Sequence, residues 1–248
     1  MIEIIAIILQ ILFITVLCYF PKKLINISGQ INIIQPISIV YISILLLFLS
    51  FISIELYYVK VILLTIFLIN LFFLFKEKNY KYFIKYRFII FLTVVFALSL
   101  NIAVDLKLGW DAQNYWLMKS LNFTNGGNIF DLQNFPRPDY PHFGSYLWAV
   151  FRSVSILDHE YFGRIFYLYI FLASIYSILD FIEISDLNKS ILFLLVVTIL
   201  SNNHFLSGYQ EILVFTYAII IGCFFLNDNK KIFKLRNLIN LSICFFII

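Results

Sequence analysis

The sequence predicts an all-α fold, a polytopic transmembrane helical bundle of about 8 spans with a large outer loop that contains interfacial helices. The chain is 62% hydrophobic and only 13% charged, whereas soluble domains are nearer half apolar and a quarter charged. Apolar runs of about 17 to 25 residues, long enough to cross a hydrocarbon core of roughly 30 Å, recur along it. We therefore expect residues 1–248 to form a single membrane domain with the lipid bilayer as a partner.

The cysteines, the net charge and the histidines argue against several classes of function. The 3 cysteines lie in apolar runs without CxxC spacing, so neither a disulfide framework nor a cysteine metal site is predicted. The net charge of +4 comes mostly from basic residues in short loops beside apolar runs, where they orient a membrane protein. We therefore expect no nucleic-acid partner. The 3 histidines, His142, His159 and His204, show no HxxxH or HExxH spacing.

The apolar runs give the expected helices in chain order. They cover residues 4–20, 36–54, 57–75, 87–104, 143–157, 161–182, 190–206, 211–226 and 237–248. The first run has neither a basic segment before it nor a small-residue cleavage site after it, so we expect a retained span rather than a signal peptide. The last run ends after about twelve residues, short of the roughly twenty that a span needs. We therefore expect the chain to be incomplete at its C-terminus.

The distribution of Lys and Arg sets the expected topology, because these residues collect in cytoplasmic loops. The basic segments 21–23 and 76–87 lie two spans apart, so both can be cytoplasmic. The N-terminus and the loop that begins at residue 105 are then outside. If every apolar run crossed the membrane, the basic segment 227–236 would also lie outside, against the rule.

The run 143–157 is the weakest candidate span. Its roughly fifteen residues rise about 22 Å as a helix, short of the hydrocarbon thickness. We expect it to lie in the membrane interface, with its aromatic side chains at headgroup level and Arg152 reaching lipid phosphates. These aromatic residues are Tyr146, Trp148 and Phe151. The segment 227–236 then returns to the cytoplasmic side, and residues 105–160 become one large outer loop.

The outer loop carries the first candidate functional residues. The stretch "WDAQNYWLMKSLNF" predicts a helix that opens at Asp111 and places Asp111, Tyr115 and Lys119 on one face, at i, i+4 and i+8. A helix N-cap is the equally weighted alternative for Asp111, because Asp accepts hydrogen bonds from first-turn amides well. Lys119 and Arg137 could instead be solvated or contact lipid phosphates, and Asp139 could form a turn between two prolines.

Glu211 is the second acidic candidate. It follows "SNNHFLSGYQ", between one apolar run and the next. In the expected topology this position is on the outer side, as is Asp111. Charges in or beside membrane spans are costly and are therefore candidates for function. We expect the two acids to face one aqueous cleft.

Several short stretches of the sequence, taken in their order along the chain, resemble a known family. These are "GWDAQNYWLMKSLNF", "RPDYPHFGSYLWAVF", "EYFGRIFYLYIF" and "SGYQE". Together they resemble the polytopic GT-C glycosyltransferases, the class that includes protein O-mannosyltransferases and lipid A aminoarabinose transferases, over roughly residues 90–226. The resemblance implies transfer of a sugar from a polyprenyl-phosphate donor to a glycan, lipid or protein acceptor. It places this transfer at the outer face of the cell inner or plasma membrane, in cell-envelope glycan assembly.

The resemblance also implies roles for individual residues. Asp111 matches the acid in the first large outer loop of that class, and Glu211, after Gly208 and Tyr209, matches a second acid that is often Asp. Arg164 matches an Arg that opens the span after the interfacial helix. The substrate-binding candidates are Tyr115, Lys119, Arg137, Asp139, Tyr140, His142, Arg164 and His204.

Two features depart from the class pattern. Tyr140 and Pro141 match an element that precedes the interfacial helix, but His142 replaces a frequent second proline. Several expected spans also precede the large outer loop, which in that class usually follows the first span.

The expected chemistry follows from the residue types. Transfer with inversion needs a base for the acceptor proton, which we assign to Asp111, and the leaving phosphate needs Lys or Arg nearby. A divalent metal, Mg²⁺ or Mn²⁺, that bridges a carboxylate and the phosphate would fit this chemistry, although no ligand pattern indicates one. The alternatives are a transporter or flippase for a lipid-linked glycan, or an inactive fragment. A transporter favours charges at span centres and paired broken helices, whereas most charges here lie at loop level.

Overall fold

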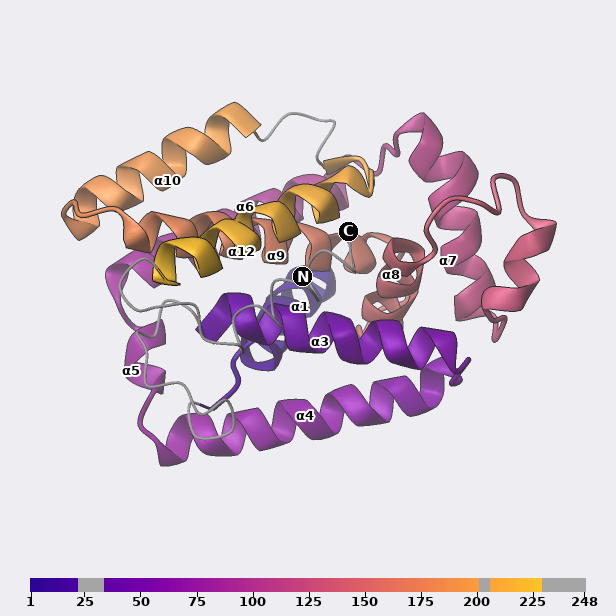
Figure 1. The fold of residues 1–248 in the computed structure, drawn as a ribbon, viewed down its shortest axis with the longest axis horizontal. Helices are drawn as coiled ribbons and strands as arrows, with labels where there is room; N and C mark the ends of the chain where they lie inside the picture. Colours follow the sequence, from indigo (N-terminus) through magenta and orange to yellow (C-terminus); the bar gives the residue numbers. More distant parts are fainter. Residues whose placement is uncertain (22–33, 201–205, 229–248) are drawn as a thin grey trace.

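The computed structural model describes residues 1–21, 34–200 and 206–228, and the regular elements within these ranges are helices (Figure 1). In chain order they are α1 (Ile2–Leu17), α3 (Ile34–Phe51), α4 (Leu56–Lys76), α5 (Tyr80–Phe83), α6 (Tyr86–Val104), η2 (Ala112–Trp116), α7 (Leu117–Thr124), η3 (Ile129–Asn134), α8 (Phe143–Ser153), α9 (Tyr161–Ile178), η4 (Leu179–Phe181), α10 (Asp186–Leu200) and α12 (Glu211–Asp228). The predicted all-α fold class is confirmed for these residues.

Four of the helical segments in the described part of the chain are long and apolar enough to cross a membrane. They are α3, α4, α6 and the continuous segment Tyr161–Phe181, which joins α9 and η4. Two shorter apolar helices, Ile2–Leu17 and Glu211–Leu226, accompany them. Helix α8 has 11 residues and rises only about 16 Å. The apolar segments therefore indicate a membrane protein. The expected total of about 8 spans stays a prediction, since four full-length candidates lie in the described part of the chain.

Helix α9 forms the centre of the bundle. Of the 18 most apolar consecutive residues in the segment Tyr161–Phe181, 94% are buried inside the protein. The corresponding share is 22% in α4 and 33% in α6. Helix α9 packs against α1, α3, α6, α8 and α12, and Figure 1 shows it running behind α12 and beside α6. Because α4 and α6 leave most of their apolar residues uncovered, these helices present the faces that suit lipid.

Buried amide side chains connect the helices around this centre. The Gln10 amide in α1 donates to the carbonyl oxygen of Phe151 in α8 at 2.9 Å. The Gln35 amide in α3 donates to the hydroxyl of Tyr169 in α9 at 3.0 Å. The Asn70 amide in α4 donates to two backbone carbonyls at the end of α1, each at 3.1 Å. Interhelical bonds of this kind contribute roughly 0.6–2 kcal/mol each in membranes.

The prediction for the orientation of α8 is wrong. Tyr146, Trp148 and Phe151 are buried in the protein and are not presented to the membrane surface. The predicted position of α8 in the membrane interface stays a prediction. The Phe151 ring stacks on Phe166 of α9 at 3.6 Å between centroids, and α8 also packs along α7. Residues 143–151 of α8 are all buried, because the helix packs between α7 and α9 and this contact removes its aromatic surface from water.

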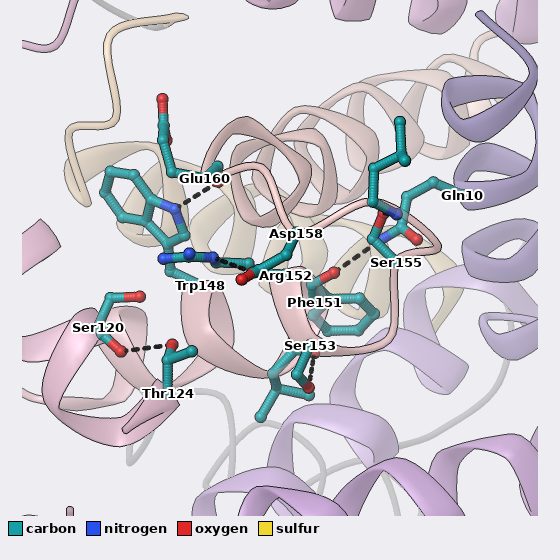
Figure 2. Close-up of polar contacts among 12 residues, drawn as sticks. Gln10, Ser120, Thr124, Trp148, Phe151, Arg152, Ser153, Ser155, Asp158 and Glu160 are labelled. Carbon is teal, nitrogen blue, oxygen red and sulfur yellow. Dashed lines mark hydrogen bonds and ion pairs between the residues drawn. The ribbon is translucent and has the colours of Figure 1, made fainter. Parts of the chain in front are cut away.

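Arg152 has a protein partner. Its Nε donates to the largely exposed Asp158 carboxylate at 2.7 Å, in the turn that connects α8 to α9 (Figure 2). The predicted contact of Arg152 with lipid phosphates stays a prediction.

The loops gather at two ends of the bundle. At the first, the Arg164 end, the segment 105–160 meets residues 206–210, because Arg164 donates to the carbonyl oxygens of both Lys107 and Leu206. At the second, the Arg87 end, Arg87 at the start of α6 forms an ion pair with Asp180 in η4. Figure 1 shows α7 and α8 on one side of the bundle and α5 on the other.

The charge pattern predicts residues 105–160 and 202–210 on one side and residues 76–87 on the other. The grouping agrees with it for 105–160, 206–210 and 76–87, and residues 202–205 lie outside the described residues. The assignment of the Arg164 end to the outer side stays a prediction. Of the predicted cytoplasmic segment 227–236, residues 229–236 lie outside the described residues.

Cysteine labelling tests the sidedness. In a variant without native cysteines, Asn125→Cys should react with a membrane-impermeant maleimide applied to the outside of intact cells, and Lys78→Cys should react only after the cells are opened. Both positions are exposed, at opposite ends of the bundle. Labelling of position 78 but not of position 125 from outside would invert the topology.

Candidate functional site

Asp111 lies at the start of an unusual helical segment. Its side chain makes no capping hydrogen bond to the helix that follows, and it is partly exposed. The N-cap alternative is therefore not supported. Residues Ala112–Trp116 form a π-helix, a rare conformation that occurs frequently at functional sites.

The π-helix changes which side chains share a face. Asp111 and Tyr115 are both partly exposed, as predicted for neighbours on one face, but Lys119 is fully buried. A π turn contains more residues than an α turn, so it rotates the positions that follow it. The predicted common face of Asp111, Tyr115 and Lys119 is therefore wrong at Lys119.

Lys119 holds the loop that contains the prolines. Its Nζ donates to the carbonyl oxygens of Arg137 at 2.6 Å and Tyr140 at 3.1 Å, and it lies 5.6 Å from the ring centroid of Trp116. Burial lowers the pKa of the Lys119 ammonium group, while the charge of Asp139 acts in the opposite direction. The backbone of Arg137 has a φ of 55°, which is uncommon for a residue other than glycine. These contacts favour a structural role for Lys119, which fixes the turn.

Arg137 and Asp139 lie at the surface of the same turn. Both are exposed, and the Arg137 guanidinium lies 5.6 Å from the ring centroid of Tyr140. The Tyr140 ring stacks on Trp116 at 5.3 Å and meets the edge of Tyr115 at 5.7 Å. The exposed guanidinium is therefore available to an anionic group, and the rings below it set its position.

His142 connects the outer loop to α3. Its Nε2 lies 3.3 Å from the hydroxyl of Ser50, and its ring meets the edge of Phe51 at 5.5 Å. Burial, together with the charge of Lys119, lowers the pKa of His142. We therefore expect a neutral imidazole at neutral pH that anchors the loop. His204, the other histidine predicted for the site, lies outside the described residues.

Arg164 is buried at the start of α9 and contacts protein groups on every nitrogen of its guanidinium. Its Nε and Nη2 donate to the two carboxylate oxygens of Glu160, and its Nη1 donates to the carbonyl oxygens of Lys107 at 3.3 Å and Leu206 at 3.0 Å. Burial raises the pKa of Glu160, and the Arg164 charge opposes this shift. These contacts favour a structural role for Arg164 over contact with a donor phosphate.

The sequence interpretation did not include Glu160. The signal for it was an acid four residues before an Arg at the start of an apolar span, the spacing of a helical ion pair.

The segments that carry the two acids lie side by side. The Gly109 amide, just before Asp111, donates to the Ser207 carbonyl at 2.9 Å. A Cβ atom added to Gly109 would lie 1.9 Å from Cε2 of Tyr209. Glu211 follows directly and is exposed at the first residue of α12. The structure thus brings the two acid-bearing segments together at one end of the bundle, and the predicted aqueous cleft between the two acids stays a prediction.

Metal ligands are sparse at this end. Among the described residues, no group of three or more His, Cys, Asp or Glu side chains could hold a metal ion. A hard cation such as Mg²⁺ can bind through one or two carboxylates and the phosphate of a substrate, so Asp111 and Glu211 are the residues that would take part.

Comparison with known proteins finds no match: no family model, no curated protein and no solved structure matches the chain. The resemblance to the GT-C class therefore stays an expectation that rests on the short stretches of sequence.

The close approach at Gly109 predicts a specific sensitivity. Gly109→Ala would place a methyl group inside the Tyr209 ring position and push the two segments apart, at a cost of about 1–3 kcal/mol. Gly222→Ala is the matched control, because its Cβ would meet Ile178 at an ordinary contact distance of 3.4 Å. Thermal unfolding in detergent should show a lower Tm for the first variant only; equal Tm values would contradict the close approach.

Proposed function

We propose that this chain is a multi-pass membrane glycosyltransferase of cell-envelope glycan assembly. It transfers a sugar from a polyprenyl-phosphate-linked donor to a glycan, lipid or protein acceptor at the outer face of the inner or plasma membrane. The observation that carries the proposal is the pairing of the two acid-bearing segments at the end of the bundle opposite the basic loop 76–87.

The proposed chemistry uses a partly exposed carboxylate, Asp111, and an exposed cation, Arg137, of the segment 105–160. Asp111 takes the proton of the acceptor hydroxyl, the acceptor oxygen forms a bond to the anomeric carbon, and the bond from that carbon to the phosphate oxygen breaks. The leaving phosphate carries the negative charge away from the sugar. Arg137 is the residue whose exposed guanidinium can stabilise this charge.

The position of charges favours an enzyme over a transporter. Transporters place charged residues and broken helices near the bilayer midplane. In the described part of the chain, the charged residues of α6, α9 and α12 lie near the helix ends, as Arg87, Arg164 and Glu211 do.

Asp111→Asn tests the proposed role of the carboxylate. The variant keeps the size of the side chain but removes its basicity, and loss of a general base lowers rates about 100 to 10,000-fold. The variant chain should insert into membranes as the wild-type chain does. Membranes that contain the variant should fail to transfer label from polyprenyl-phosphate sugars carrying a radioactive hexose or pentose, whereas wild-type membranes transfer it.

Gln113→Glu provides the matched control, because residue 113 is exposed on the same segment and lies outside the proposed chemistry. Near-normal transfer by Asp111→Asn would move the role of base to Glu211. Absence of transfer by the wild-type chain with every donor would contradict the proposed function.

A further inference from the structure

We infer that Glu160 and Arg164 form a positioning device that aligns the two acid-bearing segments. The inference rests on the proposed function, in which Asp111 and Glu211 act at one site. Neither Glu160 nor Arg164 contacts substrate in this account. They act through the backbone of the segments that carry the acids.

The guanidinium joins three separate parts of the chain. Its Nε and Nη2 are held by Glu160, just before α9, while its Nη1 reaches the carbonyl oxygens of Lys107 and Leu206. The Lys107 carbonyl belongs to the irregular segment that leads to Asp111, and the Leu206 carbonyl belongs to a helical residue just before the turn that leads to Glu211. A single planar group thus fixes both segments to the start of the central helix.

Burial makes these bonds strong constraints. Arg164 is only 2% exposed, so each of its donors needs a protein partner, and a buried charge without a partner is strongly destabilising. Buried backbone carbonyls need a hydrogen-bond donor. For Lys107 and Leu206 the Arg164 guanidinium is that donor. The Gly109 amide then donates to the Ser207 carbonyl and closes the contact between the segments.

Glu160 is itself held in place. Its backbone carbonyl accepts a hydrogen bond from the indole Nε1 of Trp148 in α8 at 2.8 Å (Figure 2). A Cβ on Gly163 would lie 2.2 Å from the Trp148 ring, so α8 and α9 approach closely at this point. The ion pair therefore sits on a rigid corner between α8 and α9, and it transmits that rigidity to the segments.

The positioning role requires the planar guanidinium of Arg, which donates in several fixed directions at once. A lysine at position 164 would keep the charge, but its single nitrogen cannot donate to both carboxylate oxygens of Glu160 and to two carbonyls in fixed directions. Because a misplacement of about 1 Å can lower a rate by 100-fold, Arg164→Lys should lower kcat by about that factor. KM should change little, since the donor-binding surface at Arg137 is untouched.

The experiment combines hydrogen exchange with kinetics for Arg164→Lys, Glu160→Gln and the control Lys189→Gln, in the full chain in detergent. The control removes a basic group that donates to the Asp180 carbonyl oxygen at 3.3 Å, at the opposite end of the bundle from both acid-bearing segments. Amides of 105–112 and 206–212 should exchange about tenfold faster or more in the first two variants, because bonds to charged groups of this strength hold local opening in check. The control should exchange as the wild type does.

Each outcome decides between the accounts. Unchanged exchange in both segments for Arg164→Lys and Glu160→Gln would overturn the inference, as would faster exchange spread evenly over α3, α4 and α6. Faster exchange confined to the two segments, with kcat lowered and KM kept, would support it. If exchange responds as expected but the wild-type chain transfers no sugar, the alignment stands and the proposed function falls.

Discussion

The bundle depends on one constraint: the central helix α9 is apolar along its length and carries a buried ion pair at each end. Glu160 and Arg164 form the first pair, and Arg87 and Asp180 form the second. From residue 160 to residue 180, a rise of 1.5 Å per residue gives about 30 Å, the thickness of the hydrocarbon core. Charges that would be costly inside a bilayer are therefore paired near the two ends of this apolar segment.

The two ion pairs have different structural roles. At the Arg87 end, the guanidinium also donates to the Tyr176 carbonyl at 3.0 Å and lies over the Tyr176 ring, 4.3 Å from its centroid. This pair connects α6 to α9 within the bundle. At the Arg164 end, the guanidinium donates to the backbone carbonyls of Lys107 and Leu206, which lie in the two segments that lead to the acids. The same physical device, a buried arginine with fixed partners, thus stabilises the helix packing at one end and orders the candidate site at the other.

Much of the fold could be predicted from the sequence, because apolar runs report helices directly. The runs 57–75 and 87–104 fall within one residue of α4 and α6. The orientation of α8 could not, since a Trp or Phe on an apolar helix fits lipid and a neighbouring helix equally well. Burial of Trp148 is decided by the partner at Gly163, which only the tertiary structure reveals.

The candidate site shows the same division. The alternation of spans predicts that Asp111 and Glu211 lie on the same side, and the structure shows their segments in contact at Gly109 and Ser207. The shared aqueous cleft stays a prediction. The sequence does not predict that Lys119 turns inward, since this depends on a π-helix and on carbonyls in a later turn. It also assigns Arg164 to a phosphate, because the partner carbonyls at Lys107 and Leu206 carry no signal in the sequence.

The central claim is that the two acid-bearing segments share one end of the bundle, and pulsed electron paramagnetic resonance measures this directly. Spin labels at Gln113 and Val214, exposed positions shortly after the two acids, should give a distance clearly shorter than labels at Gln113 and Lys78. The second pair is separated by the length of a span, roughly 30 Å. A Gln113–Val214 distance equal to or longer than the Gln113–Lys78 distance would contradict the account.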